Sequence, residues 1–223
     1  MWRENISKKQ NFPHLMQLPK ILPLLATIAA PTAFAQQLLL NPSFELPNIG
    51  LNNASYFGSL PGWTVSGPAA LISAGYTEGD ATWPAPTDGT QLLDIYSSGA
   101  ISQSVALSAG KTYSLKFDLG SLLPPTSTTY QVPASVNVYV ANPNPTSWTP
   151  FANFSVPFGT GFVTEQVTFT AITGSYVIAV YGNGGYSALD NFTLVAVPEP
   201  SSYAAIFGLG LLAWGTASRI RRK

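Results

Sequence analysis

Carboxylates are the side chains best suited to chemistry in this sequence of 223 residues, because it has no cysteine and a single histidine. Without thiols, disulfide scaffolds, zinc–thiolate sites and cysteine nucleophiles are excluded. His14 lies in an N-terminal segment that we expect to be removed, so a Ser-His-Asp triad is excluded from the mature protein as well. The carboxylates between Gln36 and Val195 are Glu45, Glu78, Asp80, Asp88, Asp94, Asp118, Glu165 and Asp190.

Glu45 and Asp190 are the first candidates for a joint site. One lies at the first expected strand and the other in the last, and the two could meet in a sandwich whose terminal strands are neighbours. Two like charges brought together cost energy unless a cation lies between them, and calcium takes six to eight oxygen ligands. The alternative is that both are solvated, or that one accepts hydrogen bonds from backbone amides.

A second candidate site lies in the segment YTEGDATW, which holds the densest polar and aromatic cluster of the chain. Aromatic rings outside the core can stack on sugar rings, while nearby amides or carboxylates bind hydroxyl groups. Ordinary loop packing is the alternative for each aromatic residue, and Trp63, which follows Pro61-Gly62, is expected in the core. The candidate ligand-binding residues are Tyr76, Glu78, Asp80, Trp83 and Trp148, and Tyr130 and Tyr186 have similar loop contexts.

We expect neither catalysis nor nucleic-acid binding. Two carboxylates suffice for glycoside hydrolysis, but here the acids are dispersed and no motif places two of them around a cleft. The formal net charge of zero hides an acidic body, because eight of the ten basic residues lie at the two ends of the chain. Between Gln36 and Val195 there are two basic residues, Lys111 and Lys116, and eight carboxylates. The resulting net charge of −6 repels phosphate.

The N-terminal 35 residues predict a secretory signal peptide. A basic stretch precedes the apolar run Ile21–Ala30, and Ala33-Phe34-Ala35 has the small residues of a cleavage site. Ten apolar residues are too few to span a bilayer as a helix. We therefore expect export through the Sec translocon and cleavage by signal peptidase after Ala35.

The C-terminal segment 197–223 has three parts in order. Pro198-Glu199-Pro200 precedes the uncharged run Tyr203–Ser218, a transmembrane helix of marginal length, and the basic tail Arg219–Lys223 follows. This tail resembles a PEP-CTERM sorting signal of Gram-negative bacteria. The resemblance implies anchoring in the inner membrane, processing by exosortase near Pro198-Glu199-Pro200, and delivery to the cell surface or extracellular matrix. A plain membrane anchor would not explain the Pro-Glu-Pro motif.

The body, residues 36–196, predicts one all-β domain, a jelly-roll β-sandwich of about ten short strands. Apolar and polar residues alternate between turns rich in Gly, Pro, Asn and Ser, and no helical period persists. In residues 111–119 the alternation places Tyr113, Leu115, Phe117 and Leu119 on one face.

Several short motifs of the body are similar to galactose-binding-like jelly rolls, especially the sugar-binding modules of bacterial polysaccharide hydrolases. They are Asn41-Pro42-Ser43-Phe44-Glu45, Pro61-Gly62-Trp63, Asp88-Gly89, Ile101-Ser102-Gln103, Gly110-Lys111-Thr112-Tyr113 and Ala188-Leu189-Asp190-Asn191-Phe192. The resemblance implies a structural calcium held by the carbonyl of Ser43, by Glu45 and by Asp190, with Asp88 near it.

Together these patterns predict an exported, exosortase-processed protein of the bacterial cell surface or extracellular matrix that binds extracellular polysaccharide without catalysis. The alternative is a structural or adhesive component of the biofilm matrix that has no defined sugar ligand.

Overall fold

The computed structural model describes residues 36–123, 131–141, 149–172 and 174–198, together with the helical residues Gly208, Leu211, Leu212 and Trp214. All of them belong to the compact unit Ala33–Lys223. Outside the described residues lie the predicted signal peptide, Tyr130, Trp148, Glu199, Pro200 and most of the predicted transmembrane helix. No helix formed by the described residues is long and apolar enough to cross a membrane.

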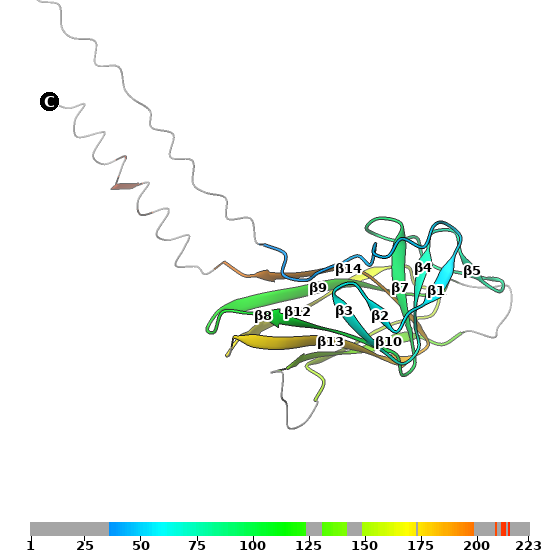
Figure 1. Ribbon diagram of the computed structural model, residues 1–223. Coiled ribbons are helices and arrows are strands. Elements are labelled where there is room, and N and C mark those ends of the chain that lie inside the picture. Colours follow the sequence, from blue (N-terminus) through cyan, green and yellow to red (C-terminus); the bar gives the residue numbers. More distant parts are fainter. Residues whose placement is uncertain are drawn as a thin grey trace, which may run out of the picture. The chain divides into compact units, whose positions relative to one another are not determined.

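Two six-stranded antiparallel sheets pack face to face (Figure 1). Sheet A contains, in spatial order, β1 (Ala54–Tyr56), β4 (Ala69–Ser73), β7 (Gln91–Tyr96), β14 (Tyr186–Ala196), β9 (Thr112–Ser121) and β12 (Val163–Thr170). Sheet B contains β11 (Ala152–Val156), β10 (Ala134–Ala141), β13 (Ser175–Gly184), β8 (Ala100–Ala106), β3 (Trp63–Ser66) and β2 (Ser59–Leu60). A small hairpin is formed by β5 (Thr77–Glu78) and β6 (Ala81–Thr82). The prediction of an all-β jelly-roll sandwich is confirmed.

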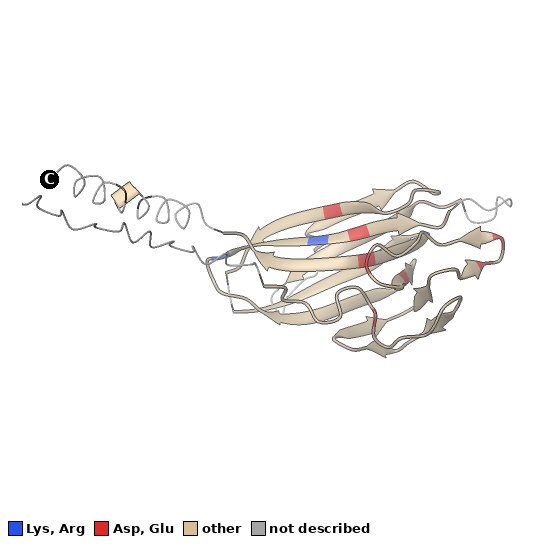
Figure 2. Ribbon diagram, turned by 90° about the horizontal axis from the view of Figure 1, so that it is seen from above, with Lys and Arg blue, Asp and Glu red and all other residues tan. Residues whose placement is uncertain are grey.

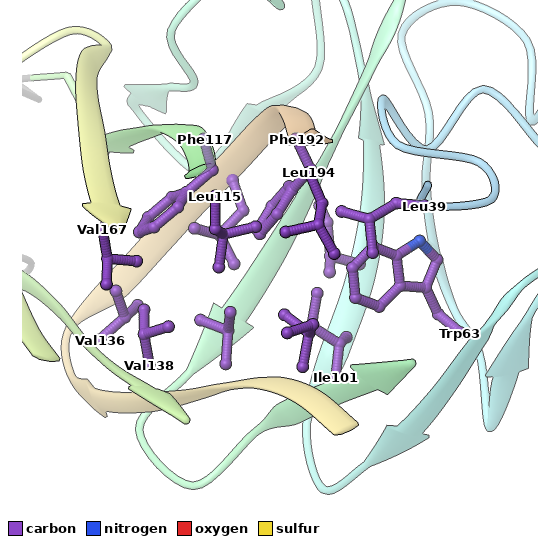
Figure 3. Close-up of a cluster of buried hydrophobic side chains, with 14 of the residues drawn as sticks. Leu39, Trp63, Ile101, Leu115, Phe117, Val136, Val138, Val167, Phe192 and Leu194 are labelled. Atoms are coloured by element: carbon purple, nitrogen blue, oxygen red, sulfur yellow. The ribbon is translucent and has the colours of Figure 1, made fainter. Parts of the chain in front are cut away.

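The core between the sheets is built by alternating side chains and is centred on aromatic rings (Figure 3). In β9 the apolar face of the predicted alternation, which includes Phe117, is buried. Phe192 stacks on Phe117 with ring centroids 5.1 Å apart and lies 5.5 Å from Trp63. Trp63 is therefore a core residue, as expected, and its indole Nε1 donates to the carbonyl of Asn41 at 3.0 Å.

A β-bulge in β14 changes the neighbour of that strand. The register with β9 shifts between Asp190 and Thr193, and Asn191 there has a positive φ of 51°. Before the bulge β14 pairs with β7. After it, the amide of Phe192 donates to the carbonyl of Pro42, so the N-terminal segment takes the place of β7.

Buried glutamine side chains hold this irregular N-terminal segment, residues 36–53. Gln91 accepts a hydrogen bond from the amide of Ile49 and donates to the carbonyls of Phe44 and Pro47. Gln103 pairs with both backbone groups of Leu40. The segment forms few ladder hydrogen bonds of its own, so these amides satisfy backbone groups that would otherwise be buried without partners.

Charge is divided unequally between the two sheets. None of the six strands of sheet B contains a charged residue. Figure 2 shows acidic residues on strands and in loops of the domain. Charged residues on the strands are Glu78 in β5, Asp94 in β7, Lys116 and Asp118 in β9, Glu165 in β12 and Asp190 in β14; Glu45, Asp80, Asp88 and Lys111 lie in connections.

We predict that Gln91→Ala lowers the free energy of unfolding by about 2–4 kcal/mol, because it leaves three backbone groups of the N-terminal segment without partners. Denaturant unfolding of the purified protein measures the loss. The matched control is Gln166→Ala on the exposed side of β12, for which we expect a change within about 0.5 kcal/mol. Equal losses in the two variants would contradict this role of Gln91.

Candidate functional site

The loop Thr87–Gln91 brings together the residues for which calcium binding was predicted. Ser43 Oγ donates to Asp88 Oδ2 at 2.6 Å. Asp190, fully buried, accepts hydrogen bonds through Oδ2 from the amides of Thr87 at 2.7 Å and Asp88 at 3.1 Å. The first half of the loop is thus held by the last strand of the domain.

Glu45 holds the second half of the same loop. Its Oε1 accepts hydrogen bonds from the amides of Thr90 at 2.8 Å and Gln91 at 2.7 Å. The loop can approach so closely because Gly89 has a φ of +77° and no side chain, and a Cβ there would overlap the Glu45 carboxylate.

Hydrogen-bond donors therefore compensate both carboxylates, which is the arrangement that the alternative interpretation describes. Within residues 36–123, 131–141, 149–172 and 174–198, no group of three or more acidic or histidine side chains could hold a metal ion. Calcium binding stays a prediction.

Asp118 is a buried acid of this region that sequence reasoning did not connect with Asp190. The two face each other across β9 and β14. Thr87 Oγ1 lies 2.7 Å from Asp118 Oδ2 and 3.1 Å from Asp190 Oδ2, and its single hydrogen can satisfy only one of them at a time. Burial raises the pKa of Asp190 to about 6, although hydrogen bonds from Asp88, Asn191 and Thr87 oppose the rise.

The hairpin β5–β6 carries the second group of predicted site residues. Tyr76 Oη donates to Glu78 Oε2 at 3.2 Å, and Asp80 lies in the turn between the strands. Trp83 is only 8% exposed, so it is not a solvent-facing platform for a sugar ring. It packs edge-on against Tyr186, whose ring centroid lies 4.7 Å from that of Tyr96.

No local sequence pattern marks Asp94, which lies beneath this hairpin on the outer face of β7. It lies between Ala70 and Ala188 in the register, and both alanines belong to the apolar cluster that contains Trp83. Burial raises the pKa of Asp94 well above its usual value, and the charge of Glu78 adds to the rise. We use the name aromatic–acid cluster for Tyr76, Glu78, Trp83, Asp94, Tyr96 and Tyr186.

The outer face of sheet B is a third surface with binding chemistry. Its central strands alternate core residues with outward-facing Asn137, Tyr139 and Tyr181. The rings of Tyr139 and Tyr181 lie 4.9 Å apart at 68°. We use the name uncharged face for the outward side chains of Thr64, Ser102, Asn137, Tyr139, Asn153 and Tyr181. The lack of charge in these strands is visible in the sequence and could have indicated the face.

A comparison with protein families finds that the family described as "Protein of unknown function (DUF642)" matches residues 37–186. This chain belongs to the DUF642 family. The PEP-CTERM protein-sorting motif matches residues 196–223 of the DUF642 chain, which confirms the prediction made from its C-terminal tail. No curated protein matches the sequence.

Solved structures similar to the DUF642 chain include carbohydrate-binding modules. TmCBM61, in complex with β-1,4-galactotriose, is 20% identical, with 73% of this chain and 100% of that chain covered and a TM-score of 0.45. The CBM22-1 xylan-binding domain of Xyn10C from Paenibacillus barcinonensis is 17% identical, with 67% and 96% covered and a TM-score of 0.45. Identities at this level say nothing about the ligand of the DUF642 chain.

We predict that the melting temperature of the chelator-treated protein rises when calcium is added, because an ion that binds only the folded state stabilises it. Differential scanning calorimetry with calcium and with chelator measures the shift. Identical melting curves would contradict the prediction.

The buried carboxyl of Asp190 predicts a stability that depends on pH. Between its usual pKa of 3.8 and about 6 the carboxyl holds a proton in the folded state and not in the unfolded state. This contribution is complete below pH 3.8 and is lost as the pH rises through about 6, by up to about 1.4 kcal/mol per pH unit.

Asp190→Asn cannot titrate and should give a flatter profile of unfolding free energy against pH than the unsubstituted protein. Both proteins are measured by urea unfolding in chelator. The pKa of Asp94 is raised in both, so the difference in slope reports Asp190. Parallel profiles would show that Asp190 does not titrate in this range.

Proposed function

We propose that the DUF642 chain is an exported surface protein that binds neutral polysaccharide non-catalytically on the uncharged face. The single observation that carries this proposal is the combination, on one open sheet face, of a tyrosine pair, two asparagines and hydroxyl side chains without any charged residue on its strands.

Such a face fits the chemistry of a neutral glycan. Aromatic rings stack on the apolar faces of sugar rings, and amide and hydroxyl groups exchange hydrogen bonds with sugar hydroxyls. Asn153, Asn137 and Tyr181 lie opposite one another on three neighbouring strands, a row of about 10 Å. Among the described residues the buried Oδ1 of Asn137 has no hydrogen-bond partner, so a sugar hydroxyl would satisfy it.

The sorting motif supports the export part of the proposal. It implies a membrane-anchored precursor. We propose that the Sec translocon and signal peptidase act on the N-terminal segment, and that exosortase processes the tail near Pro198-Glu199-Pro200. The destination proposed is the surface or polysaccharide matrix of a Gram-negative bacterium. Binding is proposed to be non-catalytic, since the strands of the uncharged face carry no carboxylate to act as acid or base.

A structural or adhesive role in the matrix, without a defined sugar ligand, is the second candidate. The burial of Ala81 and Trp83 favours it, because neither side chain presents an exposed surface on which a sugar ring could stack. This role would rest on contacts with other proteins.

We expect Tyr181→Ala to weaken binding of a neutral polysaccharide at least tenfold, since the loss of one stacking ring removes about 1.4 kcal/mol. Affinity electrophoresis against β-1,4-galactan, xylan and a neutral β-glucan measures it, with an acidic polysaccharide as the charge control. Thr168→Ala, on the exposed side of β12 in the other sheet, is the matched variant and should bind normally. Absence of binding to every neutral polysaccharide, or equal binding by the two variants, would favour the structural role.

A further inference from the structure

Beneath the hairpin β5–β6, two buried polar atoms with opposite hydrogen-bonding roles have no partner among the described residues. They are the donor Nε1 of Trp83 and the acceptor Oδ1 of Asp94, on side chains that are 8% and 6% exposed. An unsatisfied buried polar group costs about 1–3 kcal/mol, and more when it is charged. We infer that the aromatic–acid cluster is a second binding site, which takes the protonated amine and neighbouring hydroxyl of an amino sugar.

The acidic part of the cluster favours a cation. The carboxyl of Asp94 accepts one hydrogen bond from the backbone of Ser187, and the negative charge of Glu78 acts on it. The charge of Glu78 disfavours the charged form of Asp94, and a positive group near both carboxyls offsets this effect. The net charge of −6 over residues 36–195 also attracts a cationic ligand.

The aromatic part of the cluster favours the same ligand. Trp83, Tyr186 and Tyr96 form a continuous series of ring contacts, with centroids 5.9 Å and 4.7 Å apart. The faces of such rings attract ammonium groups. Tyr96 is 44% exposed, and Tyr76 and Glu78 are half-buried, so the cluster extends from solvent to the buried carboxyl.

The indole of Trp83 specifies the rest of the ligand. Its Nε1 can only donate, so it requires an acceptor and cannot bind the ammonium group. A sugar with an amine beside a hydroxyl offers both groups, the ammonium for Asp94 and Glu78 and the hydroxyl oxygen for Trp83. N-acetylation removes the charge while keeping the sugar, and therefore separates recognition of the amine from general binding of sugars.

This site lies on the outer side of sheet A, whereas the uncharged face belongs to sheet B. The amino-sugar site can therefore exist whether or not neutral polysaccharide binds. Variants at the two sites separate the two proposals.

Isothermal titration calorimetry of the full-length protein tests the inference. The protein is kept in a polyoxyethylene detergent without sugar groups, at pH 6 and low salt. The two probes are the β-1,4-linked tetramer of glucosamine and its fully N-acetylated form. We expect the tetramer with free amines to bind at least tenfold more tightly. Asp94→Asn should weaken its binding at least tenfold, and Tyr181→Ala should leave it unchanged.

Glu165→Gln is the matched control, because it removes one negative charge from β12 of the same sheet, outside the aromatic–acid cluster. It should change the affinity less than threefold. Melting curves exclude unfolding as the cause of lost binding, since Asp94→Asn removes a carboxyl whose charged form is disfavoured by burial and should melt no lower than the unsubstituted protein. Binding of neither tetramer, equal binding of both, or unchanged binding by Asp94→Asn would overturn the inference.

Discussion

The β-bulge at Asn191 is the constraint on which much of the domain depends. One extra residue in β14 lets Asp190 face outward while Phe192 faces the core two positions later. Asp190 holds the loop Thr87–Gln91, and Phe192 joins the rings of Phe117 and Trp63. The same bulge turns the amide of Phe192 toward Pro42, so the N-terminal segment docks where β7 ends.

The unequal division of charge gives the two sheets different binding chemistry. Sheet A has carboxylates on its outer side, and loops and the hairpin cover part of that side, so that Asp94, Asp118 and Asp190 are buried there. Buried carboxylates are stable only with donors or a cation beside them. Sheet B has an uncharged outer face, and its binding capacity rests on rings, amides and hydroxyls. The two proposed sites therefore differ in the charge of the ligand that they take.

The local sequence pattern was sufficient to predict burial where burial does not depend on which strands pair. The alternation in β9 predicted which face is buried, because the side chains of a strand alternate whatever its neighbours are. The position of Trp63 beside the first strands predicted its burial. The pattern around Trp83 predicted that polar and aromatic groups gather there, but it could not predict that Trp83 is covered, because the side chains that cover it come from distant strands.

The all-β class, the acidic body and the sorting tail can be predicted from the sequence alone, since composition, alternation and short contiguous motifs carry these properties. Which acids lie next to each other depends on the tertiary structure. Asp118 lies opposite Asp190 because of strand register. Asp94 lies near the apolar cluster of Trp83 because its partners in the register, Ala70 and Ala188, belong to that cluster. These residues are far apart in the chain, and their proximity depends on the pairing of strands rather than on any local pattern.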